Sequence, residues 1–467
     1  MTEVKIGLEI HLSLNKNIKT KLFCGCALPN ESSKPNTHCC PICLGLPGAK
    51  PVVNQVALQH AVKLAMALGC VIQDQIVFSR KSYFYPDLPS NYQVTQYEVP
   101  LGVGGQVVLS SGDVINLTRV HVEEDPGALI HPKGVGKSPF VLIDYNRSGT
   151  ALIEIVTEPD MHSAVHARDF LNRLLEIVKY LEIFDIKTGT IKADANISIR
   201  ESGFVRAEIK NISGFKDIER ALQYEIVRQS QAFKNNETIV QETRGWDSVK
   251  GVTYTLRSKE TEADYGYIID SNLTAISTKD FVKKVKLPEL PYEKAKRFVK
   301  QFKLPKDDAK VIAAEMELAY LFERVAKNIS PVFAAKWLRR ELVKLLKEKK
   351  KAISEVELDE KEVVTLLSLL EKNQITDLVF KELMEQLLEK RFDVKKYVEE
   401  KGLIAISDTK ELEKICNKVI KENETVADDF KKGKLQALNF LVGKVMRETK
   451  GKTSPHELAK IFKKLLK

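Results

Sequence analysis

The sequence predicts an α+β N-terminal domain with mixed or antiparallel sheets, then an all-α domain and a small helical tail module. Residues 1–288 carry many short runs in which every second residue is apolar. Such alternation is typical of strands with one buried face. Helical patterns interrupt these runs at uneven spacing, which favours α+β over a regular βαβ succession. After Pro288 and Pro291 the pattern is almost entirely helical.

Strands and helices of the N-terminal half can be placed one by one. The clearest alternating runs are VKIGLEIHLSL (4–14), GQVVLS (105–110), NLTRVHVEE (116–124) and ANISIRESGFVRAEIKNI (195–212). Apolar residues recur at intervals of three and four in ARDFLNRLLEIVKYLEI (167–183) and DIERALQYEIVRQSQAF (217–233), which predicts amphipathic helices. A further helix is expected in NQVALQHAVKLAMALG, with Asn54 as N-cap and Gly69 just beyond its last turn.

Three domains are expected along the chain. The change of pattern near Pro291 predicts a first boundary, and a break near DVKKYVEEKGLIAIS (393–407) predicts a second. The expected domains are therefore residues 1–290, 291–400 and 401–467.

Composition and charge narrow the class of protein. The chain has 467 residues, 43% of them hydrophobic, and no apolar run near the roughly 20 residues needed to span a bilayer. Its N-terminus alternates like a strand and not like a signal peptide, so we expect a cytoplasmic protein. The net charge is +10, with much lysine in the C-terminal third. This excess suits a polyanionic partner such as a nucleic acid, or simply a solvated Lys/Glu-rich surface.

Five of the seven cysteines lie within the segment KLFCGCALPNESSKPNTHCCPICLGLPG. Cys24 and Cys26 form one C-x-C pair, and Cys40 and Cys43 form a C-x-x-C pair after thirteen intervening residues. Two such pairs across a short loop predict a closed, structural zinc site with four thiolate ligands, which leaves Cys39 as a neighbour. The alternative is a redox pair, but no thioredoxin-like βαβ pattern surrounds it.

Acidic and histidine side chains recur on the predicted strands. Glu9 and His11 are two residues apart and therefore project from one face, while Leu8, Ile10 and Leu12 take the other. Other strands repeat this arrangement with His121 and Glu123, with Asp194, Asn196 and Ser198, and with Arg206, Glu208 and Lys210. Glu124 and Asp125 follow Glu123 at the expected end of its strand. Each polar face alone is explained equally well by solvation of one side of a sheet. Together they favour a site for Mg²⁺ and a nucleoside triphosphate.

Cations and aromatic residues alternate in RKSYFYPDLPSNYQVTQYEVP. Arg80 and Lys81 precede three consecutive aromatic residues, among them Tyr83 and Tyr85. This mixture suits an adenine, a ribose phosphate or an RNA end, although aromatic core contacts beside a turn are the simpler alternative. No complete P-loop or G-x-S-x-G motif is present, and KGVGKS (133–138) is interpreted as a basic turn.

A series of motifs in fixed order resembles the B subunit of the aspartyl/glutamyl-tRNA amidotransferases over essentially the whole chain. The motifs are IGLEIHLSL, KLFCGC, CPICLGLPGAKPVVN, RKSYFYPDLPSNYQVTQYEVP, RVHVEEDPG, DYNRSGTALIEIVTEPD, ADANISIR, AEIKNISGF, QETRGWD and LRSKETEADY. The tail DDFKKGKLQALNFLVGKVMRETKGKTSP resembles that family's C-terminal tRNA-binding module.

The resemblance implies a reaction and a set of partners. A cradle-shaped N-terminal domain would phosphorylate, with ATP, the side-chain carboxylate of misacylated Glu-tRNA(Gln) or Asp-tRNA(Asn). Ammonia from a glutaminase (amidase-type) A subunit would then displace the phosphate, and a small C subunit would complete a heterotrimer. Zn²⁺ and Mg²⁺ are the metal ions implied.

The resemblance also implies roles for particular residues. Glu9, His11 and Glu124, or its neighbour Glu123, are the expected magnesium ligands. Further catalytic candidates are Lys81, Asp194 and Glu208. Contacts with substrate or nucleotide are expected from Arg80, Tyr83, Tyr85, Arg200 and Lys210, and zinc ligation from Cys24, Cys26, Cys40 and Cys43.

The chain departs from the family pattern in DYGYIIDSNLTA (264–275). Gly266 stands where an arginine is usual, and Ile268 and Ile269 replace Phe-Pro. Two alternative functions remain open at this point. One is the related protein that pairs with an asparaginase-like partner and makes only Gln-tRNA(Gln), although its inserted domain finds no room here. The other is a non-catalytic, zinc-containing RNA-binding scaffold.

Overall fold

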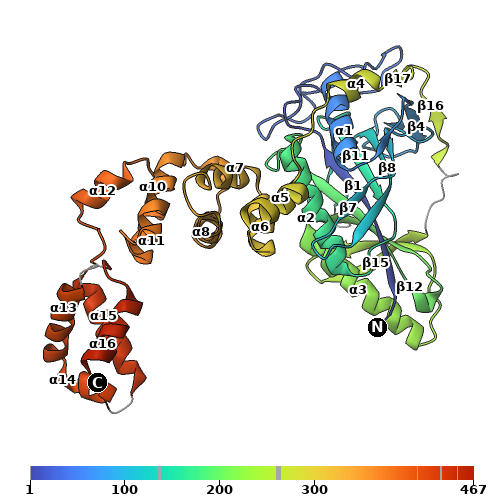
Figure 1. Cartoon of the computed structure of the whole chain (residues 1–467). Coiled ribbons are helices and arrows are strands. Elements are labelled where there is room, and N and C mark those ends of the chain that lie inside the picture. Colours follow the sequence, from blue (N-terminus) through green and yellow to red (C-terminus); the bar gives the residue numbers. More distant parts are fainter. Residues whose placement is uncertain are drawn as a thin grey trace. The chain divides into compact units, whose positions relative to one another are not determined.

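The computed structural model describes residues 2–134, 138–258, 265–406, 409–431, 434–449 and 451–466. The chain divides into two compact units, residues 1–290 and 291–467 (Figure 1). The KGVGKS turn and the LRSKETEADY motif lie partly outside the described residues. Among the helices of the described ranges, none is both long and apolar enough to cross a membrane.

A ten-stranded mixed sheet forms the frame of the first unit. Every neighbouring pair is antiparallel except β13 and β14, which run parallel. In spatial order the strands are β15 (Val252–Ser258), β14 (Glu242–Asp247), β13 (Ala207–Ser213), β12 (Ile191–Ile199), β1 (Val4–Ser13), β11 (Ala151–Thr157), β8 (Val114–Glu124), β6 (Gly102–Val103) and β2 (Val71–Ile72), with β7 (Gln106–Val108) also paired to β8. The sheet and the helices around it confirm the predicted fold class.

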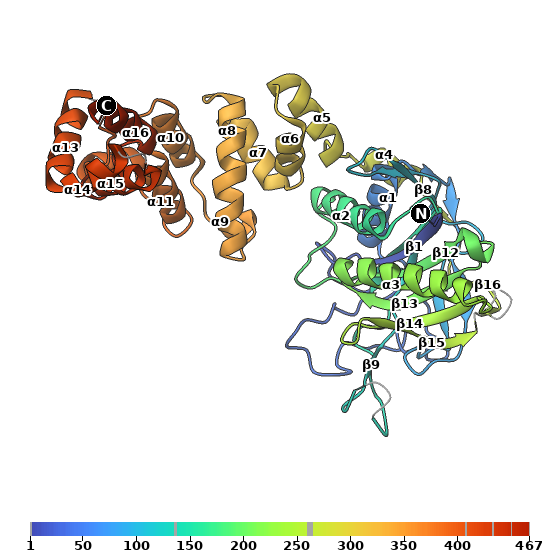
Figure 2. The same cartoon turned by 90° about the horizontal axis from the view of Figure 1, so that it is seen from below.

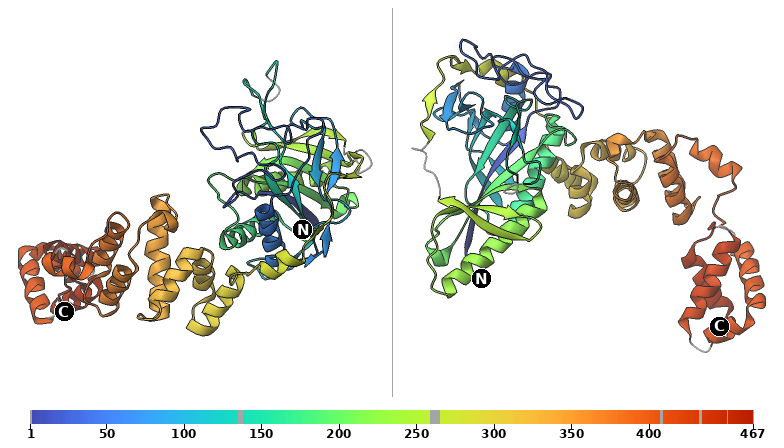
Figure 3. Two further views of the ribbon diagram at one scale, coloured as in Figure 1. Left: turned by 90° about the horizontal axis from the view of Figure 1, so that it is seen from above. Right: turned by 180° about the vertical axis from the view of Figure 1, so that it is seen from behind.

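Three helices cover one face of this sheet. They are α1 (Gln55–Ala67), α2 (Ala164–Leu181) and α3 (Phe215–Lys234), and α3 runs along β12 and β13 (Figures 2 and 3). The Asn54 side chain accepts the N–H groups of Val56 and Ala57, which confirms it as the N-cap of α1. Gly69 follows the last turn with φ +74°, a conformation that costs glycine little.

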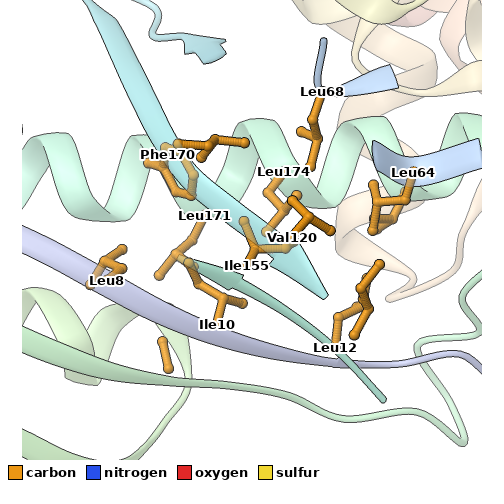
Figure 4. Packing of buried hydrophobic residues seen from close by; sticks show 14 of the residues in the cluster. Leu8, Ile10, Leu12, Leu64, Leu68, Val120, Ile155, Phe170, Leu171 and Leu174 are labelled. Atoms are coloured by element: carbon orange, nitrogen blue, oxygen red, sulfur yellow. The ribbon is translucent and has the colours of Figure 1, made fainter. Parts of the chain in front are cut away.

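The apolar side chains of β1 lie at the centre of the core. Leu8, Ile10 and Leu12 face α2 together with neighbouring strand residues, as Figure 4 shows. They are 0–1% exposed. The α2 side chains that meet them include Phe170 and Leu171. Because strand residues alternate, the opposite face of the sheet carries the polar residues of β1.

Short strands and helices complete the first unit. A three-stranded sheet consists of β16 (Ile268–Ile269), β4 (Ser79–Ser82) and β5 (Tyr92–Thr95). The remaining elements are β9 (Ala128–Ile130) with β10 (Leu142–Asp144), β3 (Gln75–Ile76) with β17 (Ile276–Ser277), η1 (Arg200–Ser202) and α4 (Lys279–Lys284). Strand β5 contacts the end of β8 and thus places part of the three-stranded sheet beside the polar face.

The second unit is helical and holds two separate apolar clusters. One cluster spans Phe298 to Val398 and the other Leu412 to Leu466. The helices of the second unit are α5 (Pro291–Phe302), α6 (Lys306–Ala313), α7 (Met316–Val325), α8 (Pro331–Trp337), the π-helical η3 (Leu338–Leu342), α9 (Val343–Glu348), η4 (Ile353–Glu355), α10 (Glu360–Glu371), α11 (Asp377–Leu387), α12 (Val394–Glu400), α13 (Thr409–Glu422), α14 (Glu424–Lys431), α15 (Leu435–Glu448) and α16 (Pro455–Leu465).

Truncation of the central core residue Ile10 tests this packing. Ile10→Ala removes methyl and methylene groups from a site without solvent access, so we expect the first unit to lose roughly 2–5 kcal/mol of unfolding free energy. Urea unfolding measured by Trp246 fluorescence, in a Trp337→Phe background, reports on this unit. The matched control Ile186→Ala, at a 62% exposed isoleucine, should change the same free energy by less than about 0.5 kcal/mol.

Candidate functional site

The polar face of the large sheet gathers charged side chains from adjacent strands. Strand β1 pairs with β11 on one side and β12 on the other, which sets His11 opposite Glu154 and Glu9 opposite Asp194. On the far side of β11, Glu154 stands opposite His121 of β8. Antiparallel pairing therefore places residues from distant parts of the chain in one row.

Three of these side chains form a compact candidate metal centre. His11 Nε2 lies 3.3 Å from Glu123 Oε1 and 3.5 Å from Glu154 Oε2. One nitrogen and two carboxylate oxygens of this trio lie within 4.8 Å of one another. His121 Nε2 approaches Glu154 Oε2 to 3.0 Å from the other side. An imidazole with two carboxylates is a donor set for a divalent cation, and its carboxylate oxygens are ligands that Mg²⁺ prefers.

Burial and neighbouring charges act in opposite directions on the pKa values of this trio. Burial lowers the pKa of His11, but the hydrogen bond with Glu154 and the charge of Glu123 outweigh it and raise that pKa to about 10. Burial raises the pKa of Glu154, yet His121 and His11 bring it well below its usual value. For Glu123 burial dominates and the pKa is raised, against the pull of His11. The three groups thus depend on one another electrostatically.

A second charged group lies on the β12–β13 side. Lys210 Nζ is 3.2 Å from Glu208 Oε1 and 3.4 Å from Asp194 Oδ2. These carboxylates raise the pKa of Lys210 despite its burial, so it stays protonated. Glu9 accepts a hydrogen bond from the Asn196 side chain at 2.9 Å. Burial and the nearby Glu154 raise the pKa of Glu9.

The polar face opens into two adjoining cavities of about 470 and 250 Å³. Both are lined by Glu9, Lys81, Glu123, Glu154 and Lys210. The two cavities thus form one groove that presents both anionic and cationic side chains. A phosphate ester and a carboxylate are ligands of the charge and size that such a groove accepts.

Aromatic rings border the groove on the side of the three-stranded sheet. Lys81 Nζ lies 4.5 Å from the ring centre of Tyr265 and 5.8 Å from that of Tyr83. Tyr97 and Tyr267 stack with centroids 4.0 Å apart. In the divergent segment, Ile268 and Ile269 pair with β4, so both tyrosines beside Gly266 still line the larger cavity.

Of the predicted magnesium ligands Glu9, His11 and Glu124, the structure places only His11 in the compact trio. Glu124 points to the opposite side of β8 from Glu123, because successive strand residues face opposite ways. Its Oε1 accepts the Val94 N–H at 2.9 Å, and burial raises its pKa to about 7. Glu9 lies in the groove but outside the compact trio with His11. Glu123, the stated alternative to Glu124, lies in the compact trio.

Three residues that were predicted to contact substrate or nucleotide lie outside the groove. Arg80 Nε forms an ion pair with buried Asp270 at 2.7 Å and so supports the three-stranded sheet. Tyr85 is more than half exposed and lines neither groove cavity. Arg200 is largely exposed and pairs with Glu3 at the far end of β1. Adjacency to a motif does not bring a side chain to the site.

Sequence reasoning missed Glu154 as a site residue. It sits alone among the apolar residues of ALIEIVT, the strand that becomes β11. An isolated acid within a strand that is otherwise apolar was the available signal, because an unpaired buried carboxylate is costly. His121, named only as a polar-face residue, is 2% exposed and supports Glu154 from behind.

The cysteine cluster forms a second, separate centre. Atoms Sγ of Cys24, Cys26, Cys40 and Cys43 all lie within 4.8 Å of one another. The Cys43 sulfur is 3.9 Å from that of Cys40 and 4.0 Å from that of Cys26. Four Zn–S bonds of about 2.3 Å require sulfurs about 3.8 Å apart, so the set fits tetrahedral zinc. Cys39 turns away toward the Asn146 side chain, as predicted for the fifth cysteine.

Comparison with known proteins identifies the group to which this geometry belongs. The family described as "GatB/GatE catalytic domain" matches residues 4–283, and the "GatB domain" family matches residues 320–466. Proteins named as the B subunit of aspartyl/glutamyl-tRNA(Asn/Gln) amidotransferase are similar over their full length. That of Carboxydothermus hydrogenoformans is 40% identical over 99% of this chain and 98% of its own.

Two further relatives of the same name extend the comparison to other organisms. The protein of Caldanaerobacter subterraneus is 41% identical over 97% of both chains. The protein of Methanococcoides burtonii is 39% identical over 99% of this chain and 98% of its own. These matches confirm the resemblance inferred from the motifs. The chain belongs to the family of the B subunits of the tRNA-dependent aspartyl/glutamyl amidotransferases.

Proposed function

We propose that this chain converts misacylated Glu-tRNA(Gln), Asp-tRNA(Asn) or both into Gln-tRNA(Gln) and Asn-tRNA(Asn), at the expense of ATP. The cluster of His11, Glu123 and Glu154 in a groove that also holds Lys81 and Lys210 is the observation that carries this proposal. A carboxylate does not react with ammonia until one of its oxygens becomes a leaving group. The groove offers charges suited to that activation.

Two displacements complete the reaction. An oxygen of the aminoacyl side-chain carboxylate attacks the γ-phosphorus of ATP, and ADP leaves with the electrons of the broken P–O bond. Ammonia then attacks the carbonyl carbon of the acyl phosphate, and phosphate departs with the C–O electrons. The nitrogen must lose a proton, and Glu9 is our candidate acceptor because its raised pKa makes it a better base than an ordinary carboxylate.

The acidic and cationic side chains of the groove would have different roles in this reaction. Mg²⁺ bound by His11, Glu123 and Glu154 would neutralise negative charge on the transferred phosphoryl group. Lys81, held beside Tyr83 and Tyr265, would contact phosphate or the substrate carboxylate. Lys210 is positioned by Glu208 and Asp194, and it would orient an anionic oxygen from the other side.

The larger cavity has an aromatic end that suits a nucleobase. The stacked rings of Tyr97 and Tyr267 offer a flat apolar surface, and the Arg119 guanidinium lies 5.8 Å from the Tyr97 centroid. Aromatic and guanidinium planes of this kind bind adenine by stacking and cation–π contact. We therefore place the ATP base in the 470 Å³ cavity and the aminoacyl end in the smaller one.

Partners and domains follow from the family and the charge distribution. Ammonia would come from a glutaminase A subunit, and a small C subunit would complete a heterotrimer. Residues 1–290 would carry the catalytic site, and residues 291–400 and 401–467 would bind tRNA. Exposed lysines on the helices, such as Lys344, Lys418 and Lys464, support this division because phosphate contacts release counterions.

The asparaginase-partnered relative is the less supported alternative. The matched catalytic family includes both kinds of protein, but the full-length relatives reported above are all named as B subunits. The second unit follows directly at Pro291 after α4 of the first, which leaves no inserted domain between them.

Two adjacent residues of β8 provide a matched test of the amidation site. We expect Glu123→Gln to lower kcat by roughly 100-fold or more, because it removes a metal-facing charge. Glu124→Gln keeps the acceptor for the Val94 N–H and should retain most activity. ATP-dependent amidation by the assembled enzyme, with tRNA affinity measured in parallel, makes the comparison.

Unchanged amidation by Glu123→Gln would contradict the catalytic assignment and favour the scaffold alternative. Loss of tRNA affinity together with activity would instead indicate a folding defect.

The cysteine cluster predicts one structural zinc ion per chain. Cys43→Ser should lose zinc and lower the unfolding midpoint, because three remaining thiolates close the loop less tightly. Cys39→Ser, which alters the neighbouring cysteine outside the cluster, should keep a full complement. Metal content by mass spectrometry of purified variants decides between them, and an equal zinc loss in both would refute the proposed ligand set.

A further inference from the structure

Lys21 is a fully buried lysine that the proposed reaction does not use. It is 0% exposed and lies between β1 and the first cysteine pair. Its backbone N–H donates to the Cys26 carbonyl at 2.9 Å. Its ammonium lies 3.4 Å from Cys43 Sγ and 3.3 Å from the Tyr145 carbonyl oxygen. A lysine without any solvent access needs a specific electrostatic reason.

No carboxylate supplies that reason. Within the described ranges, no Asp or Glu forms an ion pair with Lys21, and its two hydrogen-bond acceptors are a sulfur and a carbonyl. A carbonyl dipole alone does not compensate a buried ammonium. Glu124 also lies on this side, since a β-carbon at Gly149 would be 3.8 Å from its Oε2, but it forms no ion pair with the ammonium. The cysteine cluster is therefore the group able to carry negative charge that contacts the ammonium directly.

The charge of a zinc-loaded cluster matches this requirement. Four thiolates around one Zn²⁺ leave two surplus negative charges, and such sulfurs accept hydrogen bonds from surrounding donors. Cys43 Sγ already accepts the Cys40 N–H at 3.2 Å, and the Lys21 ammonium is its second donor. One lysine halves the surplus charge that the protein must bury.

The space around the ammonium is closed by Gly149. This residue adopts φ +83°, and its carbonyl accepts the Leu22 N–H at 2.8 Å. A β-carbon at position 149 would lie 3.5 Å from Cys43 Cβ and 3.6 Å from Lys21 Cδ. Backbone of the β10–β11 connection therefore packs directly on the Lys21–Cys43 pair.

We propose that Lys21 is a positioning residue of the zinc site, whose ammonium donates to the Cys43 thiolate and raises zinc affinity by offsetting cluster charge. This inference rests on the proposed zinc assignment. It adds that zinc and the lysine are mutually dependent: the ammonium stabilises the thiolates, and the thiolates make the buried ammonium tolerable.

Zinc affinity of the full-length chain is the first measurement. Competition with a chromogenic chelator should show 10–100-fold weaker binding for Lys21→Met, roughly the range found when partners of metal ligands are removed. Lys21→Arg keeps the charge and should recover part of the loss. Lys19→Met, at an exposed lysine two residues earlier, should bind zinc like the wild type.

Opposite changes in the thermal midpoint in two backgrounds distinguish this electrostatic role from a packing role. Lys21→Met should lower the thermal midpoint of the zinc-loaded protein. In a Cys43→Ser background, where the ammonium has lost its anionic acceptor, the same change should raise the midpoint. This second comparison also serves if the single variant fails to fold.

The outcomes distinguish the two proposals. Equal zinc affinity of Lys21→Met and the wild type, or a lower midpoint in both backgrounds, would overturn the role of Lys21 while the zinc assignment stands. A wild-type chain that holds no zinc would overturn the zinc assignment and this inference with it.

Discussion

The pairing of β1 between β11 and β12 is the constraint on which the rest of the first unit depends. Because side chains alternate along a strand, this pairing sends Leu8, Ile10 and Leu12 into the helical layer and Glu9 and His11 into the groove. A slip of one residue would exchange the two sets. The apolar core therefore sets the register that the candidate chemistry requires.

Charge balance holds the polar side of the same strands together. Carboxylates without counter-charges would repel one another in a partly closed groove, but His11, His121 and Lys210 lie among them. His121 and His11 lower the pKa of Glu154 despite its burial. In the proposed reaction these side chains would already be oriented when a divalent ion and anionic substrates enter, so little reorganisation would oppose the phosphoryl transfer.

In the cysteine cluster, too, a cationic side chain lies beside buried groups that can carry negative charge. With zinc bound as proposed, four thiolates would leave no open coordination position, and the cluster would close a long loop against the β10–β11 connection. Buried Lys21 makes the cluster part of the unit's electrostatics as well as a clasp. The two centres are distinct: Glu124 faces the side of Cys43, whereas its neighbour Glu123 faces the groove.

The sequence by itself determined the fold class, most strands and helices, the four clustered cysteines and the family, because periodicity, capping and local spacing are properties of short segments. Only the tertiary structure decided which acids meet. In the structure, Glu123 and not Glu124 lies beside His11, and Glu154 joins them. Arg80, Tyr85 and Arg200 line neither cavity of the groove. The physical reason is that strand register and facing depend on pairing between segments far apart in the chain, which no local pattern encodes.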